Sequence, residues 1–428
     1  GMQDRVMLDR SGDDVMSALA EALRRRKGAG SDKRTAIAAA LMADVRPIGY
    51  AAVEKYSLSL DGAAPREISR GELEAAMARC DEKLVAAMKR SAENIRAYQE
   101  KLLPETKIWD NGAGKLGQLV RGLTRVGIYV PGGAAAYPSS VLMNAVPARV
   151  AGVEEIIMVT PPTKNLNDAV MAAALIAGVD RVIAVGGAQA VAALTYGAGF
   201  IPRVDKLVGP GNAYVAAAKR LAFGELDIDM VAGPSEVLVI ADETANPVYA
   251  AADLLSQAEH DPLAAAVLVT TSGETARAVR AELERQTAYL ERSETIERSL
   301  DDYGALIVCA DVEAAARMAN EIAPEHLEIL TAEPEKLLPL IKNAGAIFMG
   351  ENSPEPLGDY MAGPSHVLPT SGTARFFSPL SVDSFLKKTS LISYRRDALE
   401  AIHEDIIRFA ECEGLTAHAN SIRVRFDK

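Results

Sequence analysis

The fold is decided between residues 125 and 209, where four short apolar runs follow one another: RVGIYV (125–130), EEIIMVT (154–160), DRVIAVG (180–186) and DKLVG (205–209). Alanine-rich stretches separate these runs. Strands that alternate with helices of about 10–15 residues predict βαβ units and parallel sheets. The same rhythm resumes in EVLVIA (236–241), AAAVLVTT (264–271), ALIVCA (305–310) and AIFMGE (346–351). We therefore expect an α/β fold with two Rossmann-like parallel-sheet domains.

The flanking segments have a different texture. Residues up to about 109 are rich in Ala, Glu, Arg and Lys, which predicts a helical N-terminal region. The polar C-terminal residues predict a helical tail without a strand series. We expect four parts: an N-terminal helical arm (1–30), a first Rossmann-like domain (31–130 plus 236–378), a second one (131–235) and the tail (379–428).

Composition limits the classes of partner. The chain has 428 residues and a net charge of −12, which disfavours binding to nucleic acids and to acidic membrane surfaces. No apolar run approaches the ~20 residues that a membrane span needs. The three cysteines, Cys80, Cys309 and Cys412, show no CxxC spacing and suit a reducing compartment. We expect a cytoplasmic protein without a nucleic-acid or membrane partner.

Three glycine-containing loops directly follow predicted strands: YVPGGAAAYPSS (129–140), GGAQA (186–190) and GPGNAY (209–214). In a parallel sheet such loops lie at the carboxyl ends of strands, where ligands bind. Glycines there let the backbone approach phosphates, and the helix N-termini that follow attract anions. Short connections that only pack helices are the alternative, but three such loops in one domain favour a nucleotide.

One further segment, NGAGKLG (111–117), matches the dinucleotide pattern GxGxxG with Gly112, Gly114 and Gly117. The pattern binds a pyrophosphate only where a buried strand feeds the turn and a helix follows it. The preceding residues, PETKIWD (104–110), do not predict a buried strand. We interpret this segment as a solvent-exposed loop.

Four of the five histidines lie beside acids, amides or tight turns. SQAEHD (256–261) places Gln257 and His260 three residues apart, and on a helix both would share one face. The other three settings are Glu325–His326 in APEHLE (323–328), Asp359–His366 in PLGDYMAGPSH (356–366) and Glu413–His418 in EGLTAH (413–418). The fifth, His403, has the pattern of a surface histidine.

Each of these settings also has a structural interpretation. A histidine beside a carboxylate is commonly a hydrogen bond of the fold, and neighbours on a strand, such as Glu325 and His326, would point to opposite faces. Four such settings in a histidine-poor chain nevertheless indicate a metal or acid–base site. The side chains offer only nitrogen and oxygen ligands, which suit zinc and also accept manganese or cobalt.

Together, these segments resemble the histidinol dehydrogenase family over residues 31–425. The resemblance is densest in eight strings: GIYVPGG, VGGAQAVAAL, VGPGNAYVAAAKR, AGPSEVLVIAD, DLLSQAEHD, PEHLEI, SPEPLGDYMAGPSHVLPTSGTARF and EGLTAHANSIRVR. It implies a zinc-requiring enzyme of histidine biosynthesis that oxidises L-histidinol through L-histidinal to L-histidine. This is a four-electron reaction that uses two NAD per turnover and one zinc ion per subunit.

The resemblance also assigns roles to residues. The zinc ligands would be Gln257, His260, Asp359 and His418. The catalytic acid–base pair would be Glu325 and His326. Substrate contacts would be Ser235, Glu355, His366 and Glu413, together with the zinc ligands and His326. The NAD contacts would be Tyr129, Gln189 and Asn212.

The family is a homodimer with shared active sites, so the resemblance implies that the tail reaches a second copy. Glu413 and His418 would then serve the neighbouring active site. The first domain would carry catalysis and zinc, and the second would form the NAD side.

The implied mechanism gives each member of the pair a task. His326 would accept the alcohol proton, because imidazole titrates near working pH, and Glu325 would help to activate the water that adds to the aldehyde. Both can reach one substrate if Pro324 keeps Glu325 and His326 on a loop or bulge. Zinc would mainly position the substrate's amine and imidazole.

Three other functions remain open at this point. A related enzyme could oxidise another small alcohol, such as a sulfonated diol. A zinc hydrolase could use the His/Asp cluster, although it would not need the glycine loops. A non-enzymatic relative could keep only the fold, although such chains usually lose their ligands.

Overall fold

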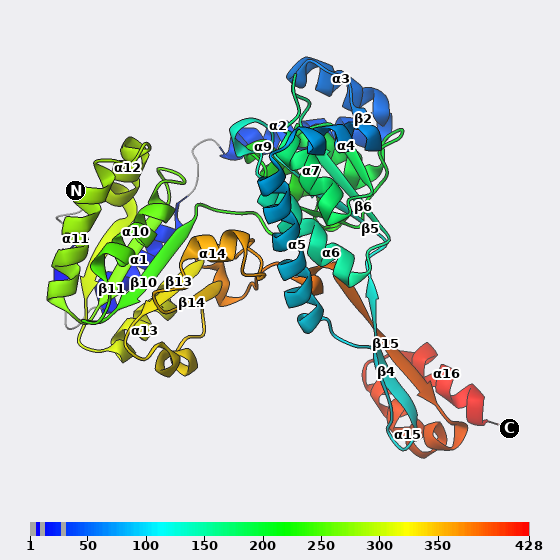
Figure 1. The fold of residues 1–428 in the computed structure, drawn as a ribbon. Helices are drawn as coiled ribbons and strands as arrows, with labels where there is room; N and C mark the ends of the chain where they lie inside the picture. The colour runs from blue at the N-terminus through cyan, green and yellow to red at the C-terminus, as the bar shows by residue number, and fades with distance from the viewer. Residues whose placement is uncertain (1–5, 9–12, 27–30, 428) are drawn as a thin grey trace.

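A computed structural model describes residues 6–8, 13–26 and 31–427 of the chain. Figure 1 shows two sheet-centred domains side by side and an arm that extends away from them to the C-terminus. Within the described residues, no helix combines the length and the apolar character that crossing a membrane requires.

The first sheet has six strands, all parallel, with β10 near its centre. Its order is β1 (Val6–Leu8), β12 (Gly304–Val308), β11 (Ala265–Thr270), β10 (Glu236–Ala241), β13 (His326–Leu330) and β14 (Ala346–Met349). Its helices are α1 (Asp13–Arg24), α10 (Pro247–Ala258), α11 (Gly273–Thr287), α12 (Ser293–Tyr303), α13 (Val312–Ile322) and α14 (Glu355–Tyr360), with a 3-10 segment, η3 (Pro334–Leu340).

Alternate residues of β10 pack on opposite faces of this sheet. Leu238 and Ile240 belong to a core with α1 and α13, whereas Val237 and Val239 belong to one with α10, α11 and α12. Burial on both faces explains why the strand is a continuous apolar run in the sequence.

The second sheet also has six strands and repeats this plan. Its order is β2 (Arg66–Ile68), β7 (Arg181–Ala184), β6 (Glu155–Thr160), β5 (Arg125–Tyr129), β8 (Lys206–Val208) and β9 (Asp227–Ile228), and only β2 is antiparallel. Its helices are α2 (Ser31–Ile48), α3 (Tyr50–Asp61), α4 (Arg70–Arg79), α5 (Glu82–Leu102), α6 (Pro138–Ala151), α7 (Asp168–Ala177), α8 (Gly187–Tyr196) and α9 (Ala213–Ala222), and η2 (Gly133–Ala135) precedes α6.

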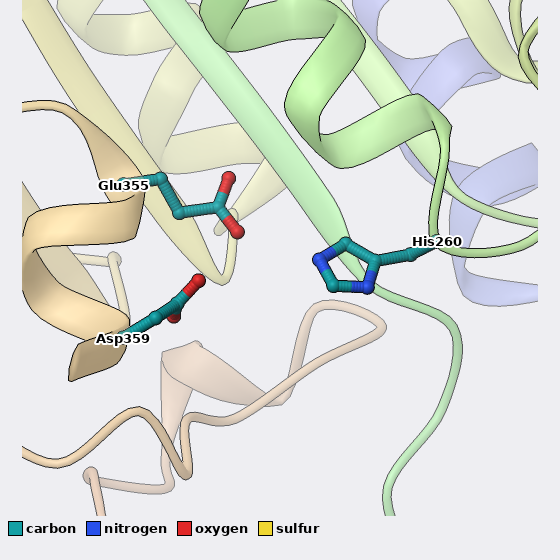
Figure 2. Close-up of side chains that lie close together, drawn as sticks. All are labelled: His260, Glu355 and Asp359. Carbon is teal, nitrogen blue, oxygen red and sulfur yellow. The ribbon is translucent and has the colours of Figure 1, made fainter. Parts of the chain in front are cut away.

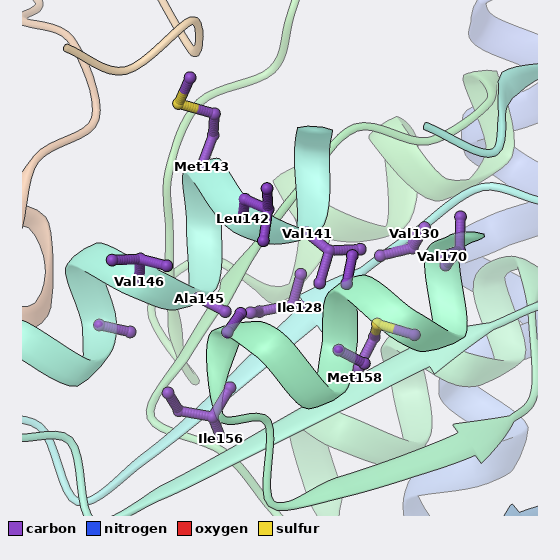
Figure 3. Packing of buried hydrophobic residues seen from close by; sticks show 14 of the residues in the cluster. Ile128, Val130, Val141, Leu142, Met143, Ala145, Val146, Ile156, Met158 and Val170 are labelled. Carbon is purple, nitrogen blue, oxygen red and sulfur yellow. The ribbon is translucent and has the colours of Figure 1, made fainter. Parts of the chain in front are cut away.

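Each face of the second sheet has its own core. Ile128 and Met158 pack with residues of α4 to α7, and Figure 3 shows this layer with Val141 and Leu142 of α6 above the strands. Ile157 and Val159 pack on the other face with residues of α2, α3, α8 and α9. The two sheets therefore confirm the predicted pair of Rossmann-like parallel-sheet domains.

The arm is built on a third, antiparallel sheet of order β15 (Leu386–Tyr394), β4 (Gly114–Gly122) and β3 (Lys107–Asp110). It carries α15 (Arg396–Cys412) and α16 (Thr416–Phe426), while η4 (Thr373–Arg375) and η5 (Val382–Phe385) precede β15. The GxGxxG segment turns from β3 into β4, so no helix follows it and no dinucleotide site forms. It is a hairpin rather than the solvent loop that we expected.

Three expectations about the domains differ from this structure. Residues 31–130 do not join the first domain, because β2 and β5 pair in the second sheet and α2 to α5 contact its helices. The described part of residues 1–30 is not a separate helical arm, because β1 pairs with β12 and α1 packs on α13. The tail contains a nine-residue strand, β15, in addition to its helices.

Candidate active site

The expected acid–base pair lies at the start of β13. His326 is the first residue of this strand, opposite Val237 of β10, and Glu325 precedes it directly after Pro324. Because Glu325 lies outside the strand, the two side chains need not point to opposite faces. Glu325 Oε1 is 3.5 Å from His326 Nδ1, and both residues are buried. The geometric difficulty of neighbouring strand residues is thereby removed.

A backbone carbonyl orients the imidazole of His326. Nδ1 lies 3.0 Å from the carbonyl oxygen of Glu236, which can only accept a hydrogen bond, so the ring donates from Nδ1. Nε2 is then unprotonated in the neutral ring and lies 3.6 Å from Glu355 Oε1. The arrangement leaves Nε2 as the basic atom, as a proton acceptor requires.

Burial shifts both members of the pair toward neutrality. It lowers the pKa of His326 to about 4, against a smaller opposing effect of the Glu236 carbonyl. Burial also raises the pKa of Glu325 well above its ordinary value, and the nearby carboxyl groups of Glu236, Glu355 and Asp359 add to this. A neutral imidazole can accept a proton, and shifted pKa values of this kind are common at catalytic sites.

Three side chains converge beside His326 in a possible metal site. Figure 2 shows Glu355 and Asp359 reaching from α14 toward His260, and their ligand atoms all lie within 4.8 Å of one another. Glu355 and Asp359 are four residues apart, so one face of the short helix presents both. Burial raises the pKa of Asp359 to about 6 and, with Asp359 nearby, that of Glu355 well above its usual range.

Gln257 and His260 come from α10, although not as expected. Gln257 is buried in the helix, but the helix ends at Ala258 and His260 lies beyond it, where its N–H donates to the Gln257 carbonyl over 3.2 Å. The amide end of the Gln257 side chain faces both carboxylate oxygens of Glu355 and Nδ1 of His326, at 3.0 to 3.1 Å. The expected pair therefore shares a turn rather than a helical face.

His366 and Ser235 complete this side of the site. His366 Nδ1 lies 3.3 Å from the Asp359 carbonyl oxygen, and burial lowers the pKa of His366 to about 4. Ser235 lines a cleft of about 850 Å³ together with His260 and Asn212. This cleft therefore brings an expected substrate contact, an expected zinc ligand and an expected NAD contact together.

The expected NAD contacts lie at the carboxyl ends of strands in the second sheet. Tyr129 ends β5, and its hydroxyl accepts a 2.9 Å hydrogen bond from Gly187 N at the start of α8. Gln189 is buried and donates to Asp61 over 2.9 Å. The Asn212 side chain accepts from Tyr214 N and Val215 N, both at 3.0 Å, and so caps α9.

A tight turn fixes the loop that carries Asn212. Gly209 has a φ of +105°, and a β-carbon there would lie 2.2 Å from the Tyr129 carbonyl oxygen. Gly209 N donates to Asp229, and its carbonyl accepts from Lys219 over 2.8 Å. Lys219 and Asp229 also form a buried ion pair with each other. This pair therefore fixes both the N–H group and the carbonyl of Gly209.

Glu413 and His418 do not join the others within one chain. Both are exposed and belong to the arm, where they line a separate pocket of about 490 Å³ between α15 and α16. Figure 1 shows these two helices at the far end of the arm.

The sequence interpretation missed several charged residues behind the site. Glu236, the first residue of β10, is buried, and its carboxylate accepts a hydrogen bond from Glu325 N over 3.2 Å. Glu328 within β13 is buried, shares a hydrogen bond with Asp253 and accepts from Glu355 N over 3.2 Å. An acidic residue inside an apolar strand, as in EVLVIA and HLEIL, was the available signal.

The chain is similar to known proteins over nearly its whole length. The model of the histidinol dehydrogenase family matches residues 24–426. Histidinol dehydrogenase from Heliobacterium mobile is 54% identical over 397 residues, which cover 91% of this chain and 93% of that protein. The enzyme from Clostridium acetobutylicum is 48% identical over 430 residues, which cover 99% and 100%.

A solved structure supports the same relationship. The crystal structure of histidinol dehydrogenase from Elizabethkingia anophelis matches with a TM-score of 0.90 and 35% identity, over 95% of each chain. Both the sequence and the fold are thus shared over nearly the whole length. The chain belongs to the histidinol dehydrogenase family.

Proposed function

We propose that this chain oxidises L-histidinol through L-histidinal to L-histidine, in a four-electron reaction that uses one zinc ion and two NAD. Membership of the family supports the overall reaction. The observation that carries the proposal is the buried His326, with its unprotonated Nε2 facing the cluster of Glu355, Asp359 and His260. A proton acceptor and a candidate metal site thus adjoin each other.

The residues present fit a divalent metal ion. Nitrogen and carboxylate oxygen donors are those that zinc accepts, and the trio of His260, Glu355 and Asp359 is already convergent. Glu325 Oε2 is buried without a partner, and several carboxyl groups nearby have raised pKa values. A bound cation would offset this repulsion. We assign the zinc to Gln257, His260, Asp359 and a His418 from a second copy, with Glu355 beside it.

Glu355 has two candidate roles, as a substrate contact and as a zinc ligand. The resemblance makes it a substrate contact, yet its carboxylate lies as close to His260 and Asp359 as a ligand would. Metal content of a Glu355→Gln variant, measured by mass spectrometry, separates the two roles. Retained zinc with weaker histidinol binding supports the substrate contact, and lost zinc supports ligation.

The loops of the second sheet fit an anionic dinucleotide. The N-termini of α8 and α9 both follow strand ends in this sheet, and the positive end of each helix dipole favours an anion there, although Tyr129 and Asn212 already accept from Gly187 N, Tyr214 N and Val215 N. Asn212 lines the cleft that also contains His260 and Ser235. We therefore assign NAD to this side of the cleft, with Tyr129, Gln189 and Asn212 forming its surroundings.

In the first oxidation step, His326 Nε2 accepts the hydroxyl proton of the alcohol while the carbon-bound hydrogen leaves as hydride. NAD, when bound, supplies the acceptor for that hydride, and zinc, when bound, supplies a positive charge that positions the substrate's amine and imidazole. The Glu236 carbonyl holds the protonated Nδ1 and so keeps Nε2 available. The product of this step is the aldehyde.

In the second step, Glu325 helps to remove a proton from the water that adds to the aldehyde. A second NAD, held by the loops of the second sheet, would supply the acceptor for the hydride of the hydrated aldehyde, and His326 would accept the hydroxyl proton as the acid forms. Burial raises the pKa of Glu325, so Glu325 takes the water proton only in its ionised form, which is then a stronger base than a carboxylate in solvent. Its position 3.5 Å from the imidazole lets both groups serve one substrate.

A homodimer would bring Glu413 and His418 to a neighbouring site. The arm exposes large apolar side chains, including Ile392 and Phe409, each 74% exposed in the single chain. Apolar surface of this kind is commonly covered by a partner. The cytoplasmic location expected from the cysteines stays a prediction, and all three are free thiols in the structure.

The test is the stoichiometry of the reaction. Purified, zinc-loaded protein is mixed with limiting L-histidinol and excess NAD, and NADH absorbance is followed to completion. Two NADH per histidinol, abolished by a chelator and restored by zinc, are the expected result. One NADH would mean that the reaction stops at the aldehyde, and none from a folded, zinc-bound protein would point to another alcohol substrate.

A further inference from the structure

Arg26, which follows the N-terminal helix, is buried at the wall of the cleft that also contains His260 and Ser235. Arg26 follows α1 by two residues, and none of its side chain is exposed. Its guanidinium group pairs with Glu236, which is 3% exposed, across 210 positions of sequence. Removing two charges from water is costly, and the cost is recovered only where geometry and further hydrogen bonds are good.

All five N–H groups of the Arg26 guanidinium have acceptors. Nε donates to the Leu23 carbonyl over 3.1 Å, and the two terminal nitrogens donate to one side chain and three further carbonyls: Glu236 Oε2, Leu263 O at 2.6 Å, Ser235 O at 3.2 Å and Pro234 O at 3.4 Å. Five donors in a rigid fork are the full capacity of an arginine. The side chain thus holds three consecutive residues, 234–236, of the segment that carries Ser235.

Glu236 connects Arg26 to Glu325 and His326 through two hydrogen bonds. Its Oε1 accepts from Glu325 N over 3.2 Å, and its backbone carbonyl accepts from His326 Nδ1 over 3.0 Å. One residue therefore contacts the backbone of the expected water-activating acid and the ring of the expected base. Misplacing reacting groups by about 1 Å can cost roughly 100-fold in rate.

We propose that Arg26 and Glu236 form a positioning pair that sets the tautomer and orientation of His326 and the placement of Glu325 and Ser235. Neither residue touches substrate in this proposal, and both act through their neighbours. The N-terminal segment that carries Arg26 thereby helps to position active-site residues, in addition to packing on the first sheet. The inference rests on the roles assigned to Glu325 and His326 in the proposed function.

The main test separates positioning from stability. Arg26→Met leaves Glu236 as an unpaired buried charge, which by itself destabilises the fold. The double variant Arg26→Met/Glu236→Met removes both charges, and an apolar pair of this size usually restores stability. We expect the double variant to regain the melting temperature of the parent but to keep a kcat reduced by about 10- to 100-fold, with an unchanged KM for NAD. Recovery of kcat together with stability would overturn the proposal.

Two further variants sharpen this result. Arg25→Met is the matched control, because Arg25 is the neighbouring arginine with a side chain that is 78% exposed, and it should leave both kcat and stability unchanged. Arg26→Lys keeps the charge but supplies three donors instead of five, so it cannot hold all of residues 234–236. We expect it to fold like the parent and to fall between the parent and Arg26→Met in kcat.

A spectroscopic measurement makes the proposal independent of the substrate. In protein with ¹⁵N-labelled histidine, the ring nitrogens of His326 report its tautomer directly. We expect Nδ1 to be protonated in the parent and in Arg25→Met, and the ring to sample both tautomers in the double variant. Identical His326 spectra in the parent and the double variant would overturn the proposal. Failure of the parent to oxidise histidinol would instead reject the proposed function and leave this readout intact.

Discussion

The two parallel sheets share one strand order but use opposite edges. Counted from its first central strand, each runs third, second, first, fourth and fifth: β12-β11-β10-β13-β14 in one and β7-β6-β5-β8-β9 in the other. In the second sheet, Tyr129 and the loop of Asn212 follow the carboxyl ends of strands. In the first sheet, Glu236 and His326 are the first residues of their strands, so the site lies at the amino edge.

The helices explain what each edge can bind. At the carboxyl edge of the second sheet, α8 and α9 begin, and helix N-termini carry a partial positive charge that suits phosphates. At the amino edge of the first sheet, α10 ends, and a helix C-terminus suits a cation. On the proposed assignments, the rule that ligands bind at the carboxyl ends of strands holds for the NAD side of this cleft but not for the metal side. The carboxyl edge of the second sheet therefore suits an anion, and the amino edge of the first sheet suits a cation.

Removal of the metal is expected to have the largest effect and to act on the amino-edge half alone. After treatment with a chelator, L-histidinol binding should disappear because its charged groups lose their anchor, while NAD binding should persist. Isothermal titration of both ligands before and after zinc is restored measures this. Parallel loss of both ligands from a folded protein would mean that the two edges are not separate.

Replacing the base gives the next largest effect. His326→Asn keeps a polar side chain but cannot accept the alcohol proton, so kcat should fall by about 10²- to 10⁴-fold, with little change in the KM for L-histidinol. Steady-state kinetics separates the two constants. His403→Asn, at a half-buried histidine of α15 outside the candidate site, should change neither. Equal losses in binding and turnover would remove His326 from the role of base.

The buried Lys219–Asp229 pair tests the opposite edge. Lys219→Met leaves Asp229 buried and unpaired, which should lower the free energy of unfolding by about 3–5 kcal/mol. Urea denaturation measures this change, and Arg220→Met, the exposed neighbour on α9, should stay within about 0.5 kcal/mol of the parent. The KM for NAD should also rise in Lys219→Met, because the pair holds Gly209. A destabilisation no larger than that of the control would show that the loop is held in another way.

The smallest effect compares one helix cap in each domain. Asn212 caps α9 and Asn246 caps α10, where its side chain accepts from Val248 N over 2.9 Å. Each Asn→Ala change should cost about 1 kcal/mol of stability, measured by urea denaturation. Only Asn212→Ala should weaken NAD binding in a calorimetric titration. Equal weakening by both variants would remove Asn212 from the cofactor side.

The apolar strands could be predicted from the sequence, whereas β13, which begins with His326, could not. All eight predicted runs became strands, and seven of them are continuous apolar runs because both of their faces are buried, whereas β14 is only partly buried. β13 was considered as a strand around Glu325 and His326 but was not among the predicted runs, because His326 and Glu328 interrupt the apolar residues of HLEIL. Exposed strands such as β3 were missed for a similar reason, since no face of them is buried.

Local rules would have placed His260 better than the helical pattern did. Pro262 follows it by two residues, and a helix ends before such a proline because the ring clashes with the preceding turn. The pairing of Arg26 with Glu236 has no local signal at all, because 210 residues separate the partners. The assignment of residues 31–130 failed likewise, since it depends on which sheet α2 covers.

The pairing of the edge strand β1 has a consequence for folding during synthesis on the ribosome. Val6 lies opposite Leu306 in the register, so β1 is made 300 residues before the strand with which it pairs. At about 5–20 residues per second, it waits for roughly 15–60 s. The second sheet, made entirely from residues 66–228, can close long before that. During this interval β1 has no neighbouring strand with which to pair. Arg26 becomes buried only when the first sheet is completed around it.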